Sequence, residues 1–177
     1  MIPSCVESVA VPAASAAPWY ALRTRSRHEK LVHARLTSLG VETFLPLQRR
    51  VQRWSDRKRL IELPLFPGYL FLRGDALQRE RAAWTPGAVG YAGTDRAPGV
   101  VAADELDAVR AVIARLVPFD PYPGLLCGQR VRVTAGPLRG VVGTLVERGR
   151  HYRLQIAIQA IGRSILAEVD ATDVEPD

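Results

Sequence analysis

Histidine and cysteine are the side chains that most often bind metals or act as nucleophiles, and this sequence holds few of them. Its three histidines are His28, His33 and His151, and its two cysteines are Cys5 and Cys127. None of the histidines stands at a metal-ligand spacing from a cysteine or a carboxylate. Two distant cysteines make neither a disulfide framework nor a four-ligand zinc site. We therefore expect no metal, no cofactor and a reducing, cytoplasmic setting.

A group of carboxylates in the segment 103–116 is the other place where catalysis is conceivable. Asp104, Glu105 and Asp107 open this segment, and its apolar residues recur at helical spacing. Carboxylates in the first turn of a helix interact favourably with the positive end of the helix dipole, which explains them without any chemistry. The sequence also contains no G-x-S-x-G, Walker or G-x-G-x-x-G motif. We predict that the protein is not an enzyme.

Basic side chains form the stronger chemical signal. Residues 19–73 hold 12 Lys/Arg and 4 Asp/Glu, a net charge of +8, whereas residues 74–117 come to −1 and residues 118–177 to zero. Charge confined to one block is typical of a surface that faces nucleic acid, although a solvated face that keeps the protein soluble is the alternative. Trp54 lies within the densest part and adds a surface for base stacking. The candidate nucleic-acid-binding residues are Arg23, Arg25, Arg27, His28, Arg53 and Arg57.

The elements that position these residues follow from hydrophobic periodicity and from Gly and Pro breaks. Strands are predicted at 19–24, 41–47, 61–66, 69–73 and 88–93, and helices at 26–39, 75–83 and 103–116. The basic segment 48–60 has no clear period, and we interpret it as a mobile loop or a hairpin. The order β-α-β-β-β-α-β-α predicts an αβ sandwich over residues 19–117.

The composition changes after residue 117. Residues 118–126 are rich in Pro and Gly, which is typical of a semi-rigid linker. Residues 127–177 have no helical period and read as short strands punctuated by glycines, which predicts a small β-barrel. Residues 1–18 are expected to form a disordered tail, and no apolar stretch is long enough for a membrane helix.

Five segments, in the correct order, resemble the NusG family of transcription elongation factors. They are "WYALRTRSRHEKLVHARL", "LFPGYLFLR", "WTPGAVGYAG", the KOW motif "GQRVRVTAGPLRGVVGTLVE" and the closing "IGRSILAEVDATDVEP". The resemblance implies an α+β fold: an N-terminal αβ sandwich of the ferredoxin-like NGN type at 19–117, followed by a small SH3-like KOW barrel at 127–177.

The resemblance also implies a docking surface for RNA polymerase. It places the clamp helices of the largest polymerase subunit in a pocket bordered by aromatic residues next to a Pro-Gly turn, and it implies that 79–84 faces the opposite side of the DNA channel. The residues concerned are Trp19, Phe66, Pro67, Gly68 and Tyr69. Phe66 and Tyr69 are expected to carry most of the contact. The alternative is that the three aromatic residues belong to the core.

The KOW barrel is implied to recruit a second protein, either a small-subunit ribosomal protein or the Rho termination factor. The implied contact residues are Gly136, Pro137, Leu138, Ile161, Gly162 and Arg163. The family has an aromatic residue where this chain has Ile161, so stacking on the partner is lost and the choice of partner stays open. Whether the protein promotes or opposes termination also stays open.

Two arginines connect the basic block to a specialised branch of the family. Arg25 and Arg35 fall at positions that resemble DNA-facing ones in RfaH-like antiterminators, which favours contact with non-template DNA by a specialised paralogue. We expect a monomer that suppresses pausing and has no membrane partner. A ribosome-associated or RNA-binding KOW protein is the rival interpretation, and it does not account for the F-P-G-Y strand.

Overall fold

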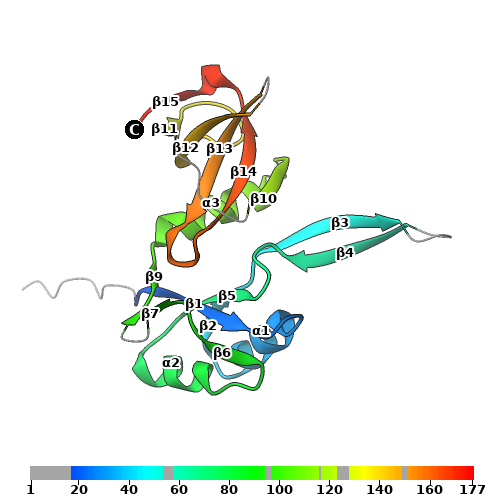
Figure 1. The fold of residues 1–177 in the computed structure, drawn as a ribbon, viewed down its shortest axis with the longest axis vertical. Coiled ribbons are helices and arrows are strands. Elements are labelled where there is room, and N and C mark those ends of the chain that lie inside the picture. The colour runs from blue at the N-terminus through cyan, green and yellow to red at the C-terminus, as the bar shows by residue number, and fades with distance from the viewer. Residues whose placement is uncertain (1–16, 54–57, 95–96, 116, 123–127, 149–150) are drawn as a thin grey trace, which may run out of the picture.

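The computed structural model describes residues 17–53, 58–94, 97–115, 117–122, 128–148 and 151–177. Two units follow one another along its long axis: an αβ sandwich built from the N-terminal half and a β-barrel built from the C-terminal half (Figure 1). The expected tail at 1–18 lies almost entirely outside the described residues.

The sheet of the sandwich is centred on β1 (Trp19–Thr24). On one side β1 pairs antiparallel with β5 (Tyr69–Arg73), and β5 pairs in turn with β2 (Glu42–Phe44). On the other side β1 pairs with β6 (Ala88–Tyr91) and, nearer its start, with β9 (Val100–Val101). Two short strands, β7 (Gly93–Thr94) and β8 (Ala97–Pro98), form a separate small sheet.

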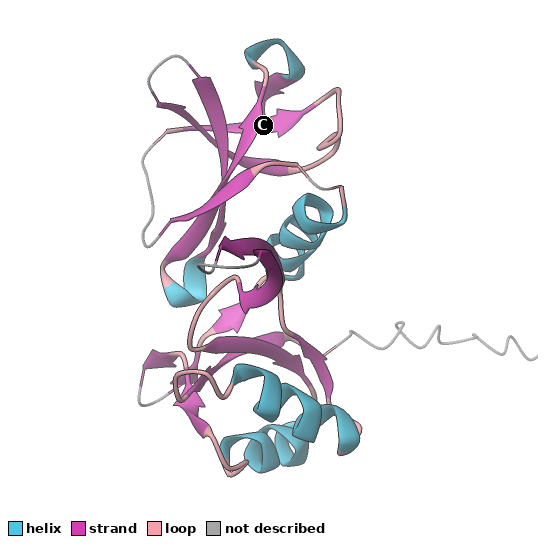
Figure 2. Ribbon diagram, turned by 90° about the vertical axis from the view of Figure 1, so that its right-hand side faces the viewer, coloured by secondary structure: helices cyan, strands magenta, loops and turns pink. Residues whose placement is uncertain are grey.

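Helices cover both faces of this sheet, which explains why β5 has no polar residue between Tyr69 and Leu72. Leu70 and Leu72 pack with residues of α1 (Glu29–Ser38) and α2 (Ala76–Ala83). Phe71 points to the opposite face, where it belongs to the cluster that contains α3 (Ala103–Ala114). Figure 2 shows α1 and α2 below the sheet and α3 between the sheet and the barrel.

Two helix boundaries show which local signals decided the structure. Asp75 caps α2 as expected: its side chain accepts a hydrogen bond from the Gln78 backbone N–H (2.7 Å), and the Gln78 side chain accepts one from the Asp75 N–H (3.0 Å). The first helix begins at Glu29 and not at residue 26, because Arg27 adopts a left-handed backbone conformation with φ of 64°.

The basic segment 48–60 forms a hairpin. Strands β3 (Leu47–Arg53) and β4 (Lys58–Pro64) pair antiparallel and project away from the sandwich (Figure 1). The expected strand at 61–66 therefore splits: residues 61–64 belong to the hairpin, whereas Leu65 and Phe66 are buried in the connection to β5.

The C-terminal unit is a six-stranded antiparallel barrel-like sheet. Its strands are β10 (Phe119–Tyr122), β11 (Gln129–Val133), β12 (Val142–Arg148), β13 (His151–Ile158), β14 (Arg163–Val169) and β15 (Val174–Pro176), in the order β10-β14-β13-β12-β11-β15. Two short 3-10 turns are η1 (Gln159–Ile161) and η2 (Ala171–Asp173). Strand β10 lies inside the expected linker 118–126, because residues 119–122 pair with β14 and extend the sheet.

Candidate functional site

The Pro67-Gly68 turn is held by a buried carboxylate. Gly68 has φ of 81°, a conformation that favours glycine, and its backbone N–H donates to Glu29 Oε1 at 2.8 Å. Glu29 is only 4% exposed, and it lies in the first turn of α1. The carbonyl of Gly68 accepts from the Thr24 N–H at 2.9 Å. These bonds fix the turn against β1 and α1. Glu29 has no distinctive signal in the sequence, because it is a single carboxylate within a basic segment.

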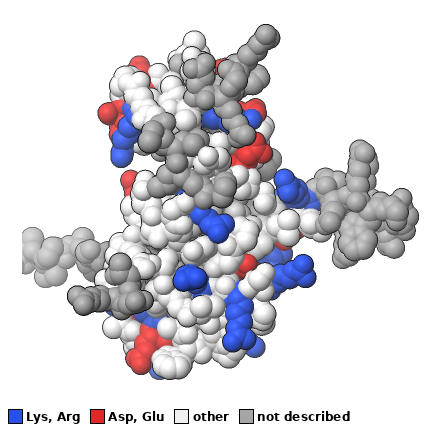
Figure 3. All heavy atoms as spheres, viewed as in Figure 1, with Lys and Arg blue, Asp and Glu red and all other residues white. Residues whose placement is uncertain are grey.

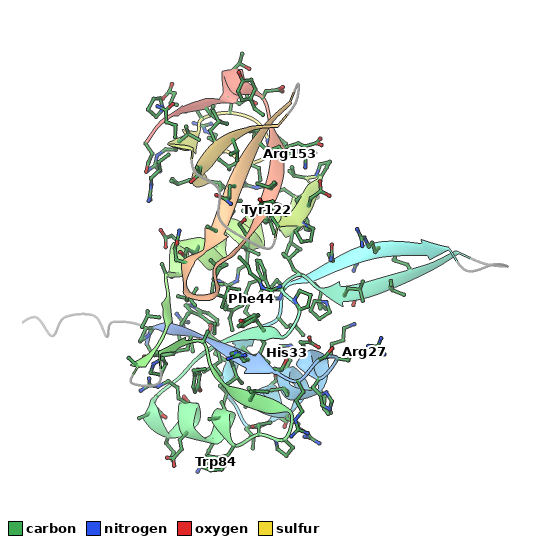
Figure 4. The ribbon with its side chains drawn as sticks, viewed as in Figure 1. Arg27, His33, Phe44, Trp84, Tyr122 and Arg153 are labelled. Atoms are coloured by element: carbon green, nitrogen blue, oxygen red, sulfur yellow. The ribbon has the colours of Figure 1, made fainter. Side chains whose placement is uncertain are left out.

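Aromatic residues from β1, β2, β5 and this turn gather on the face of the sheet that α3 covers. Phe66 packs edge-on against Phe71, with ring centroids 6.0 Å apart. The guanidinium of Arg110 on α3 lies 4.4 Å from the Phe44 ring centroid and 5.1 Å from that of Trp19. Figure 4 shows Phe44 at the centre of the molecule, between the sandwich and the barrel. We call Trp19, Phe44, Phe66 and Tyr69 the aromatic face.

The aromatic face is largely covered in this structure. Trp19 is 4% exposed and Phe66 is 2% exposed, and both belong to one apolar cluster that continues into the barrel. Tyr69 is half-buried. Pro67 is exposed at the turn. The expected surface pocket around Phe66 is thus closed in this arrangement of the two units.

Arg110 of α3 covers Trp19 and Phe44, and barrel residues contact Tyr69 and the α3 region. The guanidinium carbon of Arg163 lies 5.5 Å from the Tyr69 ring centroid. The Gln159 N–H donates to Glu105 Oε1 at 3.2 Å, and Arg115 Nη1 donates to the Arg139 carbonyl at 3.4 Å. The residues expected to bind polymerase and part of those expected to bind a KOW partner therefore contact one another.

Glu105 is a carboxylate of α3 that contacts the barrel and has a perturbed pKa. Burial is the main cause that raises its pKa above the usual range, and the neighbouring Asp104 carboxylate raises it further, while hydrogen bonds from the Gln159 and Ala102 backbones act in the opposite direction. Its Oε2 is buried and has no hydrogen-bond partner among the residues that the structure describes. Since burial disfavours the charged form, protonation of Glu105 is easier here than for an exposed carboxyl group.

The residues implied to bind a KOW partner are divided between two places. Pro137 and Leu138 line a cavity of about 250 Å³ together with Tyr152 and Val169. Leu138 is 2% exposed and belongs to the barrel core, whereas Gly136, with φ of 71°, turns the chain beside it. Ile161, Gly162 and Arg163 do not line that cavity; they lie where η1 and β14 meet the sandwich.

The basic residues of β1, α1 and the segment between them lie mostly at the surface of the sandwich. Arg23, Arg25, Arg27 and Arg35 are exposed, and His28 is half-buried with Nδ1 2.9 Å from the Ser26 carbonyl oxygen. Figure 3 shows Lys and Arg side chains gathered over the part of the molecule that holds α1 and β6. Figure 4 shows Arg27 projecting outward near the start of α1. Arg25 and Arg35 contact the Pro86-Gly87 turn, Arg27 precedes α1, and Arg23 lies on β1; we call these four exposed arginines the basic face.

A second part of the predicted nucleic-acid surface is the hairpin. Arg49 and Arg50 are exposed on β3, and Arg49 forms an ion pair of 3.3 Å with Glu62 on β4. Arg53 ends β3, but its side chain is not described, and Arg57 lies outside the described residues. The backbone register places position 53 opposite position 58 at the end of the hairpin that points away from the sheet.

A family model described as transcription termination factor NusG matches residues 17–110, more than half of the chain. The chain belongs to the NusG family. Its general function is therefore that of a transcription termination/antitermination factor. No helix of the described residues combines the length and the apolarity required to cross a membrane.

NusG proteins are similar to this chain over nearly its full length. The termination/antitermination protein NusG of Thermus thermophilus is 27% identical over 177 residues, covering 88% of this chain and 96% of the relative. The Pseudomonas aeruginosa NusG is 28% identical over 175 residues, covering 89% and 97%. A solved structure titled "Domain interaction in Thermotoga maritima NusG" has a TM-score of 0.51 at 18% identity, covering 90% of this chain and 96% of that one, and supports the fold.

Proposed function

We propose that the NGN sandwich docks on the clamp helices of the largest RNA polymerase subunit through the aromatic face. The observation that carries this proposal is the turn at Pro67-Gly68, which the buried Glu29 carboxylate fixes between Phe66 and Tyr69. A rigid turn with aromatic residues on both sides suits a hot spot for a protein partner. No reaction is required: a factor that binds only the polymerase with a closed clamp draws the population away from paused states.

Docking then requires the barrel to move aside. Arg163 lies over the Tyr69 ring, so the closed arrangement and a polymerase helix compete for this part of the aromatic face. The apparent dissociation constant for polymerase equals the intrinsic constant divided by the fraction of open molecules. The same movement would expose Ile161, Gly162 and Arg163 to a small-subunit ribosomal protein or to Rho.

Tyr69 is a suitable residue to test docking, because it is half-buried and its loss should disturb the core less than the loss of Trp19 or Phe66. In the full-length chain, Tyr69→Ala is expected to weaken binding to core polymerase by about thirtyfold or more, as removal of a hot-spot residue does. Tyr152→Ala is the matched control, because Tyr152 is a 39%-exposed tyrosine of the barrel. An unchanged affinity of the Tyr69 variant, with circular dichroism showing a folded chain, would contradict the proposal.

The basic face is proposed to contact the non-template DNA strand in the elongation complex. Its exposed arginines suit phosphate neutralisation, so binding to elongation complexes should weaken steeply as salt rises. A dependence on the non-template sequence would mark a specialised paralogue, and binding that is indifferent to salt would indicate a role through protein contacts only. Pausing and termination assays with and without Rho then report the direction of the effect.

A further inference from the structure

Trp84 is placed unusually for a tryptophan. Its side chain is 81% exposed, the highest fraction among the exposed large apolar side chains of the described residues. It caps the C-terminus of α2, and Figure 4 shows it at the outer edge of the sandwich. Tryptophan is usually well buried, because its large ring gains from leaving water. An indole held in water at a helix end contributes little to the core.

The backbone around Trp84 is well held. Its N–H donates to the Glu80 carbonyl at 3.2 Å. Thr85, the next residue, is 7% exposed, and its hydroxyl donates to the Arg81 carbonyl at 3.0 Å. The Ala88 N–H donates to the Thr85 carbonyl at 2.9 Å. The exposed indole is therefore presented by an ordered turn.

This turn is joined to the basic face. Arg35 Nη1 donates to the Pro86 carbonyl at 2.8 Å, and the Arg25 N–H donates to the Gly87 carbonyl at 2.8 Å. Arg81, three residues before Trp84 on the same helix, is exposed as well, although Glu80 beside it is also exposed. Hydrogen bonds thus connect the turn that follows the exposed indole to a surface suited to phosphates.

We infer that Trp84 is a stacking platform for an unpaired base of single-stranded DNA whose phosphates follow the basic face. The inference rests on the proposed contact with non-template DNA and adds the chemical group that is recognised. A flat indole binds the face of a nucleobase, and that face is accessible only when the base is not stacked within a duplex. The platform therefore selects unpaired strands and tolerates different bases.

The test is a titration of the full-length chain into a fluorescently labelled single-stranded DNA oligonucleotide, followed by anisotropy. Trp84→Ala is expected to weaken binding between about fivefold and one hundredfold, the range for loss of one aromatic stacking contact. Trp84→Phe should retain most of the affinity, because it keeps an aromatic ring. The matched control is Leu77→Ala, which truncates another exposed apolar side chain of α2 (54%) and should change nothing.

Three further ligands separate stacking from other contacts. An oligonucleotide without bases should bind the wild-type chain and Trp84→Ala equally weakly, and a duplex should show no effect of the substitution. Arg35→Ala should reduce the slope of log affinity against log salt by about one, whereas Trp84→Ala should leave that slope unchanged. An effect of Trp84→Ala that appears only with single-stranded RNA would overturn the assignment to DNA.

Several outcomes would overturn the inference while leaving polymerase docking intact. They are no binding of single-stranded DNA by the wild-type chain, equal affinity of wild type and Trp84→Ala, or an equal loss on the ligand without bases. If Trp84→Ala instead weakens binding to polymerase free of nucleic acid, Trp84 is a protein contact. Polymerase docking is tested separately by the affinity of Tyr69→Ala for core polymerase. This variant should bind the oligonucleotide with the affinity of the wild-type chain.

Discussion

The aromatic face and the Trp84 turn use the same residue types in opposite ways. At the aromatic face the cations already have partners: Arg73 lies 5.2 Å from the Trp19 ring centroid and pairs with Glu42, and Arg110 covers Phe44 and pairs with Asp107. At the Trp84 turn the indole is exposed, and so are Arg81 and Arg35, although Arg35 donates one hydrogen bond to the Pro86 carbonyl. Aromatic rings beside arginines therefore stabilise the fold in one region and remain available to a ligand in the other.

The two surfaces differ in whether the barrel has to move before a ligand can bind. A partner that binds the aromatic face as proposed would have to displace Arg163 from Tyr69, whereas Trp84 is exposed in the closed arrangement. Binding of nucleic acid should thus be possible before the barrel moves, and polymerase docking only after it.

Truncating one ring in each region should show the largest contrast. Phe66→Ala is expected to lower the free energy of unfolding by about 3–5 kcal/mol, because it opens a cavity in a packed core. Trp84→Ala should change it by about 0.5 kcal/mol or less, as an exposed substitution does. Denaturant unfolding of both variants measures the contrast, and similar losses would mean that Trp84 is part of the packed structure.

The next largest effect should come from replacing Glu29, whose carboxylate holds the Pro67-Gly68 turn. Glu29→Ala leaves the Gly68 N–H without its acceptor and should cost about 1–3 kcal/mol of stability. Glu29→Gln keeps an acceptor oxygen and should cost less. Chemical denaturation ranks the two variants, and equal losses would show that charge matters more than the hydrogen bond.

Loosening the barrel should have a smaller effect, and one that increases binding. Arg163→Ala removes a cation–π contact worth about 0.5–1 kcal/mol at an accessible site. The ratio of open to closed molecules, followed by NMR or small-angle scattering, should rise about two- to fivefold, and polymerase affinity should rise with it. Arg153→Ala is the control within the barrel, because Arg153 pairs with Asp120 and Glu168 of the same unit. Weaker polymerase binding by Arg163→Ala would argue against competition between barrel and polymerase.

The smallest predicted effect is a pH dependence of closure. Burial raises the Glu105 pKa, and if the barrel supplies more of that burial than its Gln159 hydrogen bond offsets, the closed form binds a proton more tightly than the open form. Closure should be favoured as pH falls through the window between the ordinary and the raised pKa, and weakened above it. Glu105→Gln should remove this dependence. A pH profile of the open fraction that is the same in both chains would show that Glu105 does not contribute.

The sequence predicted the elements of the sandwich well where the signal comes from residues that are close together in the chain. The Asp75 cap, the helical spacing from Leu106 to Val112 and the apolar run of β5 all gave the correct element. Signals that depend on distant partners failed. Phe119 to Tyr122 contains a proline and resembles a linker, yet it forms a strand because β14 offers an unpaired edge. The sequence of 48–60 is compatible with both a loop and a hairpin for the same reason, since only the pairing of β3 with β4 orders it.

The amino-acid order alone determined the family, the two-unit organisation and the concentration of positive charge, because periodicity, turn residues and charge are local properties. Tertiary structure decided which aromatic rings are covered, that Glu29 holds the Pro67-Gly68 turn, and that Arg163 lies over Tyr69. These outcomes depend on contacts between residues far apart in the chain, and burial is set by those contacts and not by residue type.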